Sequence, residues 1–485
     1  MQSYDIVIIG GGIIGTALAR ELSRYKLRVA ILEKEEELAF GVSKSNSGII
    51  HPGTQNPPQS LKGRLCVLGN QLTRRISREL GVDFKEVGEL IVAFHPDDIP
   101  RLRELKKEAE ALGVPRLKIV DRPWLRENEP NLNPRAVAAL YAPTAGIISP
   151  YRWVYDLAEN AAHNGVEIYT RAQVEGIDLR GGPRRGGRAA FEVHTRLRGT
   201  FETRYIINAA GLFADEISRM VGVDDFRITP RKGEEFLLDK KREHIARHLL
   251  FPLPGKNSKG ILVIKTADGN PMIGPTAEEV GDKNDLSTSD QGLEKVLASA
   301  RQMIPTLSER DIIAYFAGLR PAAGDDFIIR HEDRAPGFIN VAGIQSPGLT
   351  AAPAVALMVV GILRKQGLAL RRKLFFDRYR KKTTHLFAVS LAETKSLIKR
   401  DPAYGDIVCR CEMVSAKEVR DAIGRGARTL DGIKFRTRAQ AGRCHGGFCT
   451  TRIMKILAQE TKQPLTKITK RGKGSEIVQK DRADN

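Results

Sequence analysis

The sequence predicts an α/β protein, α+β overall, in which a parallel-sheet nucleotide-binding domain is interleaved with an antiparallel-sheet domain and followed by a small cysteine-rich domain. Three observations predict this architecture. A strand, glycine turn, helix and strand pattern occupies residues 4–32, and short apolar runs that end in small residues recur at 205–208 and 338–341. Four of the five cysteines lie between positions 409 and 449. The 485 residues suffice for roughly two to four domains.

The segments between these runs belong to a second domain. Residues 236–239 and 261–265 have the pattern of antiparallel strands, and residues 101–112 that of a charged, exposed helix. We therefore assign residues to a nucleotide-binding domain (1–85, 146–222 and 323–370), a substrate domain (86–145 and 223–322), a basic connector (371–405), a cysteine domain (406–460) and a tail (461–485), whose polar residues 470–485 are expected to be disordered.

The positive charge is concentrated near the C-terminal end. The chain carries 78 Lys and Arg against 58 Asp and Glu, a net charge of +20, of which residues 371–485 account for +16. A basic segment raises the question of a nucleic-acid partner. Its aromatic residues are few, however, and Phe375, Phe376 and Tyr379 form no recognisable stacking platform, so no nucleic-acid partner is expected. The composition excludes collagen-like, coiled-coil and wholly disordered proteins.

No membrane-spanning segment and no signal peptide are expected. The strand predicted at 5–9 leaves no room before it for a charged and apolar leader, which favours a cytoplasmic protein. The longest apolar block, residues 351–363, is shorter than the roughly 20 residues that a spanning helix needs, and it contains Pro353 and Gly361. We expect a buried helix there. Peripheral contact with a membrane stays open.

The glycine turn has the features of a dinucleotide site. Gly10, Gly12 and Gly15 follow a strand and open a helix, and Glu33 ends the next strand. The first glycine permits the tight turn, the second lets the backbone approach a pyrophosphate, and the third lets the helix pack on the strand. The helix N-terminus then faces the phosphates, and Glu33 accepts hydrogen bonds from ribose hydroxyls. The pattern predicts a Rossmann-like domain but does not separate NAD from FAD.

Three separated segments resemble the FAD-dependent oxidoreductases of the D-amino-acid-oxidase type. They are the glycine turn, residues 206–215 and residues 340–350, in that order. The resemblance implies FAD as cofactor, with the adenosine diphosphate half on the first segment. The last segment brings a glycine-rich turn and a helix N-terminus under the flavin ring, where a helix dipole stabilises the anionic reduced flavin. The cofactor-binding residues expected there are Ala210, Gly211, Gly343, Gly348, Leu349 and Thr350.

Residues 45–53 and 60–66 resemble a subgroup that includes glycerol-3-phosphate dehydrogenases and L-2-hydroxyglutarate oxidoreductases. In this subgroup Ser47 and Gly48 would approach the flavin. His51 would lie on the substrate side, where it is either the general base for the alcohol proton or a structural residue that orients its loop. The C–H hydrogen would leave as hydride to the flavin.

Basic residues are the candidates for holding an anionic substrate. Arg320 stands where the family carries an arginine that faces the substrate, and its fork of donors suits carboxylate or phosphate. The other interpretation of Arg320 is an ion pair at the surface or between domains. Lys232 and Lys265 are further candidates for the same pocket.

Two features bear differently on the substrate. The segment after His51 lacks the arginine expected in glycerol-3-phosphate dehydrogenases and reads Pro52-Gly53-Thr54-Gln55 instead. The C-terminal cysteine domain, in contrast, resembles the one fused to the large subunit of anaerobic glycerol-3-phosphate dehydrogenases. We therefore expect an enzyme that oxidises a small anionic secondary alcohol, glycerol 3-phosphate first and L-2-hydroxyglutarate second. The alternative of another class is a non-catalytic redox or assembly subunit.

Four cysteines predict a metal centre. Cys409 and Cys411 form a C-x-C pair, and Cys444 and Cys449 follow after a helical stretch. Four thiolates suit a [2Fe–2S] cluster. Zinc is the alternative, although C-x-C is tighter than the spacing usual for zinc. The segment resembles bacterioferritin-associated ferredoxin. A cluster beside a flavin would pass electrons singly to a redox partner, and the surrounding basic residues would dock an acidic one.

Overall fold

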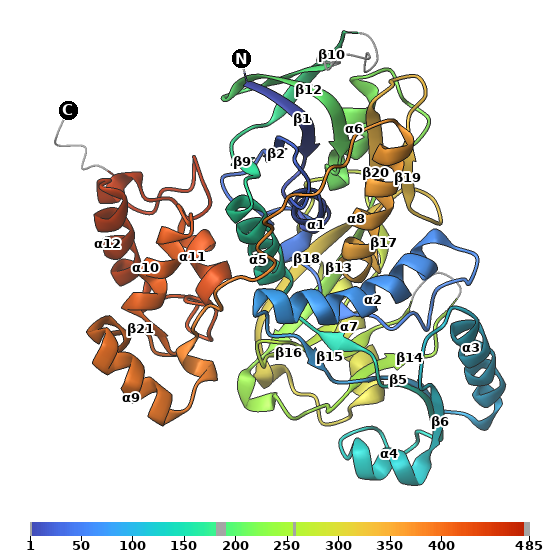
Figure 1. Ribbon diagram of the computed structural model, residues 1–485. Helices are drawn as coiled ribbons and strands as arrows, with labels where there is room; N and C mark the ends of the chain where they lie inside the picture. The colour runs from blue at the N-terminus through green and yellow to red at the C-terminus, as the bar shows by residue number, and fades with distance from the viewer. Residues whose placement is uncertain (1, 181–190, 256–258, 480–485) are drawn as a thin grey trace.

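The computed structural model describes residues 2–180, 191–255 and 259–479. It consists of two sheet domains stacked on each other and a C-terminal lobe at their side (Figure 1). The chain passes between the two sheet domains several times before it enters the lobe, so the predicted interleaved α/β architecture is confirmed.

The first sheet carries the nucleotide-binding pattern. Its parallel core has the order β9 (Glu167–Tyr169), β2 (Val29–Leu32), β1 (Gln2–Ile9), β12 (Gly199–Asn208) and β20 (Phe338–Ala342). The antiparallel strands β10 (Val174–Leu179), β11 (Phe191–Thr195) and β19 (Ile328–His331) extend it. The central strand β1 is apolar throughout its second half because both faces of the sheet are covered.

Helices cover one face of this sheet. They are α1 (Ile13–Leu22), α2 (Leu61–Leu80), α5 (Pro150–His163) and α8 (Gly348–Lys365), and α6 (Ala214–Arg219) follows β12. Ile6 and Ile8 of β1 pack beneath these helices, whereas Val7 and Ile9 pack on the opposite face with Phe191. Successive side chains of β1 therefore point alternately into two separate hydrophobic cores.

Helix α8 contains the apolar block at residues 351–363, for which the sequence predicts a buried helix. By length and composition it is the one helix within the described residues that is able to cross a membrane, but 61% of it is buried inside the protein. It packs against α1 and α2, and Gly69 of α2 approaches it so closely that a Cβ there would lie 2.1 Å from the Thr350 carbonyl oxygen. The structure therefore shows a core helix, as the sequence predicts.

The second sheet is mainly antiparallel. Its order is β18 (Ile312–Ala322), β13 (Thr229–Leu238), β16 (Pro271–Gly274), β15 (Leu262–Lys265), β14 (Leu249–Pro252), β5 (Glu89–Ala93), β7 (Ala138–Ala142) and β6 (Lys118–Asp121), with β17 (Glu278–Glu279) also on β13. Helices α3 (Ile99–Ala111), α4 (Arg122–Asn128) and α7 (Asp290–Met303) pack around it. A small sheet of β3 (Ile49–Ile50), β8 (Gly146–Ile147) and β4 (Lys85–Glu86) lies where the two domains join.

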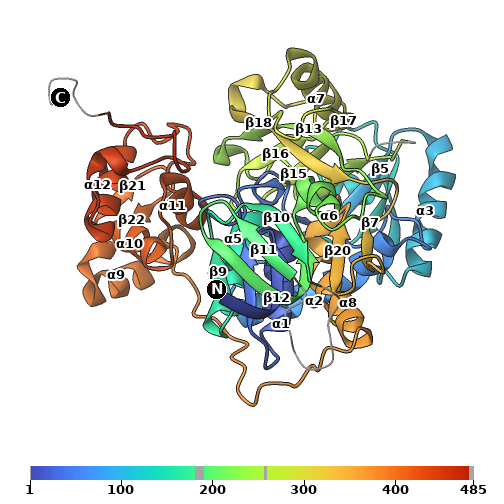
Figure 2. The same cartoon turned by 90° about the horizontal axis from the view of Figure 1, so that it is seen from above.

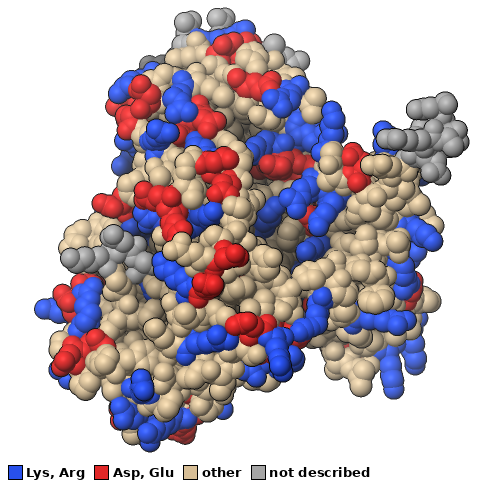
Figure 3. All heavy atoms as spheres, turned by 180° about the vertical axis from the view of Figure 1, so that it is seen from behind, with Lys and Arg blue, Asp and Glu red and all other residues tan. Residues whose placement is uncertain are grey.

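The connector lies against the body of the protein and leads to the C-terminal lobe (Figure 2). Arg380 is held by Asp156 and Glu159, both on α5. The lobe contains α9 (Leu391–Arg400), the short strands β21 (Ile407–Cys409) and β22 (Val414–Ser415), and the helices α10 (Ala416–Gly424), α11 (Leu430–Thr437) and α12 (Thr450–Thr461). Figure 3 shows charges of both signs over the body, and mainly Lys and Arg on the lobe.

The prediction of a disordered tail is wrong for the part that the structure describes. The carbonyl oxygens of Thr469 and Lys470 accept hydrogen bonds from the N–H groups of Leu430 and Asp431 at the start of α11. Ile468 is buried in the core of the lobe. One apolar residue within a polar stretch was enough to anchor this segment. Residues 480–485 of the expected tail lie outside the described residues.

Candidate active site and cysteine centre

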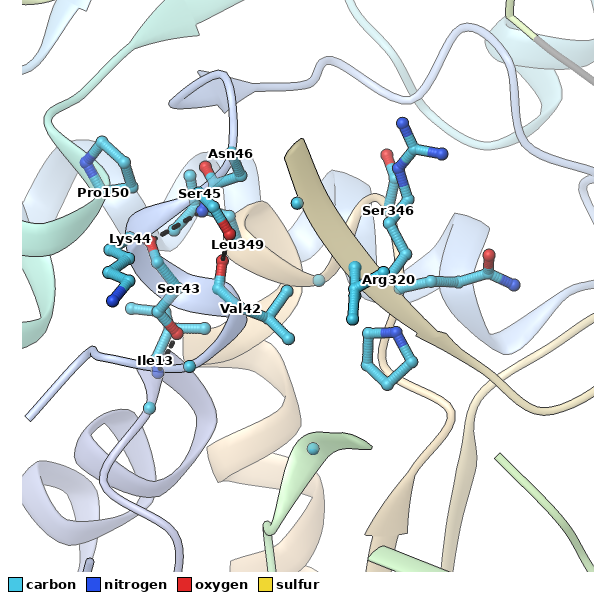
Figure 4. Close-up of a pocket in the computed structure, with 18 of the residues that line it drawn as sticks. Ile13, Val42, Ser43, Lys44, Ser45, Asn46, Pro150, Arg320, Ser346 and Leu349 are labelled. Carbon is cyan, nitrogen blue, oxygen red and sulfur yellow. Dashed lines mark hydrogen bonds between the residues drawn. The ribbon is translucent and has the colours of Figure 1, made fainter. Parts of the chain in front are cut away.

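A cavity of about 2160 Å³ lies where the two sheet domains meet the C-terminal lobe. Ordinary small-molecule pockets measure about 300–1000 Å³, so this cavity has room for a dinucleotide and a substrate together. Figure 4 shows part of it, with the segment from Val42 to Asn46 beside Leu349 and with Arg320 and Ser346 across the space. From the lobe, Phe435, Arg438 and Gln440 contribute to its wall.

The glycine turn forms one end of the cavity. Gly10 has φ +112°, and a Cβ at Gly10 would lie 2.4 Å from the Ala209 carbonyl oxygen. A Cβ at Gly15 would lie 1.9 Å from the Gly10 carbonyl oxygen. Gly12 caps the N-terminus of α1 and lines the cavity. Only glycine fits these close approaches, and the backbone is left open to a ligand.

Glu33 is buried beside this turn. Its carboxylate accepts hydrogen bonds from the N–H of Gly11 at 2.7 Å and from the N–H of Glu35 at 2.9 Å. Burial raises the pKa of Glu33. Glu33 lines the cavity at the end of β2, where the sequence predicts that it binds the ribose hydroxyls of the dinucleotide. The geometry of the turn and of Glu33 fits the adenosine half of FAD.

Most of the other FAD candidates line the same cavity. Ser47, Gly348 and Leu349 line it, as do Ala210 and Gly211 next to the glycine turn. Gly48 and Gly343 instead shape the backbone, with φ of +69° and +67°. A Cβ at Gly48 would lie 2.3 Å from the Ile148 carbonyl oxygen.

Thr350 is not among the residues that line the cavity, and its side chain contacts the backbone of His51 instead. Its hydroxyl accepts a hydrogen bond from the N–H of His51 at 2.9 Å and donates to the carbonyl oxygen of Ile49 at 3.3 Å. The carbonyl oxygen of His51 accepts from the Asn70 amide at 3.0 Å and from the Cys66 thiol at 3.5 Å. Both backbone groups of His51 are thus held, which fixes where its ring enters the cavity.

The His51 ring is neutral at physiological pH. Burial and, to a smaller extent, the charge of Lys259 lower the pKa of His51 to about 4, against the opposing effect of Glu89. His51 Nδ1 lies 3.9 Å from Glu89 Oε2, and the ring packs against Phe251. Glu89 is fully buried and accepts a hydrogen bond from the Thr54 hydroxyl. A neutral imidazole is able to accept a proton.

Arg320 lies on β18 across the cavity. Its guanidinium donates to the Thr276 carbonyl oxygen at 3.1 Å. A Cβ at Gly233, on the neighbouring strand β13, would lie 2.6 Å from Arg320 Nη2, so this glycine makes the room for the guanidinium. Burial lowers the pKa of Arg320 and raises the pKa of the adjacent Glu235 to about 7. Because Glu235 is partly protonated at neutral pH, its carboxylate only partly neutralises the Arg320 guanidinium. The remaining positive charge is able to attract an anion.

The structure does not bring Lys232 to this pocket. Alternate residues of β13, including Arg231 and Glu235, line the cavity, and Lys232 points to the other face of the strand. There its ammonium pairs with Asp285 at 2.9 Å. The prediction of Lys232 as a substrate ligand is therefore corrected by the pleat of the strand. Lys265 is not among the residues that line the cavity either.

The sequence reasoning missed Lys259. Lys259 lines the cavity, and burial lowers its pKa, which the nearby charges of Lys62 and Arg320 lower further. Lys259 and Arg320 line the same cavity, and the charges of Arg320 and of the buried Glu89 both act on the Lys259 ammonium. Lys259 stands in a loop between strands, where no periodicity or motif marked it. Its flanking glycine, Gly260, was the only local signal.

The four cysteines converge in the C-terminal lobe. Cys411 Sγ and Cys444 Sγ are 3.6 Å apart, close to the roughly 3.8 Å expected for two thiolates at 2.3 Å from one tetrahedral metal ion. A hydrogen bond with Cys449 lowers the pKa of Cys409, so the other two thiols are also in contact. Each contact joins one cysteine of the C-x-C pair to one of the later pair. The four sulfurs fit a metal centre, and Cys411 is exposed.

Comparison with known protein families agrees with both sites. The family model described as FAD dependent oxidoreductase matches residues 5–361. The model described as BFD-like [2Fe-2S] binding domain matches residues 407–459. The second match favours a [2Fe–2S] cluster over zinc on Cys409, Cys411, Cys444 and Cys449.

Individual relatives extend over most of the chain. A glycerol 3-phosphate dehydrogenase of Caloramator mitchellensis is 41% identical over 98% of both chains. A mitochondrial L-2-hydroxyglutarate dehydrogenase of Caenorhabditis elegans is 30% identical over 74% of this chain and 93% of its own. The structure of a dithionite-reduced, FAD-bound L-α-glycerophosphate oxidase of Mycoplasma pneumoniae superposes with a TM-score of 0.72 at 32% identity and covers 78% of this chain and 98% of its own. The chain belongs to the FAD-dependent oxidoreductase family and carries a [2Fe–2S] domain at its C-terminal end.

Proposed function

We propose that this enzyme oxidises glycerol 3-phosphate to dihydroxyacetone phosphate and passes the electrons on through its cluster. The observation that carries the proposal is the 41% identity to a glycerol 3-phosphate dehydrogenase over 98% of both chains, which includes the cluster domain. The oxidase relative of known structure is similar over the flavoprotein part alone, 78% of this chain. A shared cluster domain favours a dehydrogenase over an oxidase.

Two cations would hold the phosphate. Arg320 and Lys259 both line the cavity, and the coupling between their charges raises the potential of one region of it. Within the described residues neither Arg320 nor Lys259 forms an ion pair with a carboxylate, so both charges are available to a dianion. Arg320 would supply paired donors, and Lys259 would supply a point charge.

His51 would take the hydroxyl proton. Its ring is neutral at pH 7 and its backbone is fixed by Thr350, Asn70 and Cys66. FAD, when bound, accepts the hydride that leaves the same carbon. As the imidazole gains the proton, Glu89 at 3.9 Å stabilises the resulting positive charge. On one side the ring of Phe251 packs against the His51 ring, which shields that side of the imidazole from water.

Electrons would leave at the exposed side of the cluster domain. Cys411 is exposed there, and so are Met413 and Phe448, which flank the cysteines in sequence and are 47% and 86% exposed. The half-exposed guanidinium groups of Arg443 and Arg452 stand nearby in the sequence. Exposed apolar side chains on a lobe that carries mainly Lys and Arg suit an acidic one-electron carrier protein.

Anaerobic titration of the holoenzyme tests the substrate. We expect glycerol 3-phosphate to bleach the flavin absorbance at lower concentration than L-2-hydroxyglutarate, and glycerol to leave it unchanged because it lacks the anion. Bleaching by L-2-hydroxyglutarate alone would make L-2-hydroxyglutarate the substrate in place of glycerol 3-phosphate. The segment Pro52-Gly53-Thr54-Gln55 favours that second candidate, because it lacks the arginine expected in glycerol-3-phosphate dehydrogenases. If none of a panel of 2-hydroxy acids and polyol phosphates bleaches the flavin, the non-catalytic subunit takes the place of the enzyme.

A further inference from the structure

A buried ion network joins the C-terminal lobe to both sheet domains. Its centre is Asp268, in the turn between β15 and β16. The Asp268 carboxylate accepts hydrogen bonds from the Tyr151 hydroxyl at 2.6 Å, from Arg152, and from Arg438 Nη1 at 3.1 Å. Burial would raise the pKa of Asp268, but Arg152 and Arg438 hold it well below its usual range. At neutral pH the network therefore holds a charged carboxylate between two guanidinium groups.

Within the described residues of this network, Arg438 is the only lobe residue that contacts the lobe itself and both sheet domains. Besides Asp268, its guanidinium donates to the Asn270 side chain at 2.7 Å, to the Tyr151 hydroxyl at 3.2 Å, and through Nε to Glu412 at 2.9 Å. Its side chain is 7% exposed. Glu412 in turn pairs with Lys240 of the body at 2.7 Å. One guanidinium thus spans the boundary between lobe and body.

The same residue lies beside the cysteine centre. Glu412 directly follows Cys411, and the backbone N–H groups of Glu412 and Gln440 donate to Cys409. Gln440 is two residues after Arg438 and lines the large cavity, as Tyr151 does. The wall of the flavin cavity and the surroundings of the cysteines therefore share the short segment 438–440.

A second contact holds the other side of the cysteine loop. The His445 ring nitrogen Nε2 lies 2.7 Å from the carbonyl oxygen of Ile313, and Arg443 donates to the carbonyl oxygen of Arg310 at 3.0 Å. Farther away, Glu37 of the body is buried against α11 and accepts hydrogen bonds from Arg436 and from the N–H of Arg428. The lobe is docked by polar contacts at three places, of which those at Arg438 and Glu37 are largely buried, an arrangement that a freely swinging electron-carrier domain would not have.

We propose that Arg438 positions the cluster domain for electron transfer, and that electrons pass from the flavin cavity to the cysteine centre across segment 438–440 without movement of the lobe. The inference rests on the proposed function only in its direction of electron flow. The alcohol loses two electrons and two protons, one proton to His51 and the other, with both electrons, as hydride. The two electrons then leave one at a time to two one-electron acceptors, and the protons return to solvent.

Arg438→Met tests the positioning role. The variant removes the charge, keeps an apolar stem of similar length, and leaves Asp268 and Glu412 without their shared partner. We expect electron transfer from flavin to cluster to slow by about tenfold or more relative to flavin reduction in the same variant, because misplacement of reacting groups by about an ångström has effects of that size. Rapid-freeze EPR of the reduced cluster, together with stopped-flow absorbance of the flavin, measures the two steps separately.

Three further proteins complete the test. Arg438→Lys should restore part of the rate, because it keeps the charge without the fork. Asn270→Ala removes one acceptor of Arg438 and should slow the transfer by less than Arg438→Met. Arg452→Met is the matched control, because Arg452 pairs with Asp406 inside the lobe and not with the body. Its transfer rate should equal that of the wild type.

Flash photoreduction of the flavin keeps the test independent of the substrate. If light-driven transfer to the cluster is as fast in Arg438→Met and Asn270→Ala as in the wild type, the positioning role is overturned. If transfer slows in these variants while no alcohol reduces the flavin, the positioning role stands and the proposed function fails. An unchanged EPR line shape in Arg438→Met excludes damage to the cluster itself as the cause.

Discussion

The hydroxyl of Thr350 accepts a hydrogen bond from the N–H of His51 at 2.9 Å, although the two residues are 299 positions apart in the sequence. Thr350 is in the first turn of α8 and is fully buried. The N-terminus of α8 lies at the flavin end of the cavity, where Gly348 and Leu349 line it. The Thr350 hydroxyl therefore ties the His51 loop directly to the helix that begins at the part of the cavity that receives the flavin.

Thr350→Val should lower kcat by about tenfold while the FAD content of the purified enzyme stays the same. Valine has the shape of threonine but leaves the buried N–H of His51 without an acceptor, at a cost of about 1–3 kcal/mol. The loop relieves this cost by shifting, which misplaces the imidazole. Steady-state kinetics with glycerol 3-phosphate and an artificial acceptor measure the effect. Thr350→Ser keeps the hydroxyl and should recover most of the rate; equal losses in both variants would contradict the hydrogen-bond explanation.

His51 should make the folded protein less stable in mild acid. The folded-state pKa is about 4 and the ordinary value is 6.5, because burial disfavours the imidazolium. Between these values the unfolded chain binds the extra proton, so the free energy of unfolding falls as the pH drops below about 6.5. From pH 7 to pH 4.5 the loss attributable to His51 is about 2–3 kcal/mol.

Chemical denaturation of the wild type and of His51→Gln at pH 7 and pH 4.5 measures this loss. Glutamine does not titrate, so the difference in stability between the two proteins should move in favour of the variant by that amount at the lower pH. Glu235, whose pKa is raised by burial, acts with the opposite sign, but it is present in both proteins and cancels. Parallel behaviour of the two proteins would mean that His51 is protonated in the folded state.

Arg320 and Lys232 should differ sharply in their effect on substrate binding. Arg320→Met removes a charged donor that faces the cavity, and we expect KM for glycerol 3-phosphate to rise about 100-fold, since a charge-assisted hydrogen bond lost to a bound anion is worth about 1.5–3 kcal/mol. Lys232→Met removes an equal charge from the far face of the neighbouring strand, so KM should stay within about twofold of the wild type. A large rise in KM for Lys232→Met would show that Lys232 binds the substrate despite its ion pair with Asp285.

The sequence predicted the parts of the site that depend on backbone geometry. Gly10, Gly12 and Gly15 are recognisable because a close approach leaves no alternative to glycine, and the strand before them is recognisable because it is buried on both faces. The four cysteines were equally visible, since thiolates in a cluster have few other uses. The fold class followed from these elements and is confirmed.

Positions that depend on tertiary packing were not predictable. Lys232 and Arg231 are adjacent, and only the observed phase of β13 shows that Arg231 faces the cavity. Lys259 is one of 78 basic residues, and apart from its flanking Gly260 nothing in its loop distinguished it before the fold placed it in the same cavity as Arg320. Arg438 belongs to a lobe whose docking depends on Asp268, 170 positions away. Pairing over such distances leaves no local pattern in the sequence.

Loss of one cluster ligand should separate the two redox steps. Cys411→Ser removes a thiolate from the four, and we expect the iron content to fall while FAD content and flavin bleaching by substrate stay at wild-type levels. Turnover with an acceptor protein should be abolished, because electrons no longer have a one-electron exit. Cys66→Ser is the control: Cys66 lies in the flavoprotein body, far in sequence from the four, and should retain the iron. Iron analysis and visible absorbance of both variants decide it.

Gly15→Ala and Gly361→Ala exchange the same residue types on two helices and should have opposite effects. A Cβ at Gly15 would lie 1.9 Å from the Gly10 carbonyl oxygen, so α1 must move away from the turn that receives the pyrophosphate, and we expect the protein to purify largely without FAD. Gly361 lies in α8, where a new Cβ would meet nothing within 4 Å. Alanine there should raise the free energy of unfolding by about 0.5–1 kcal/mol, because it restricts the unfolded chain and favours the helix. FAD absorbance and thermal unfolding of the two variants measure both effects. Retention of FAD by Gly15→Ala would show that the cofactor does not depend on the close approach of α1 to β1.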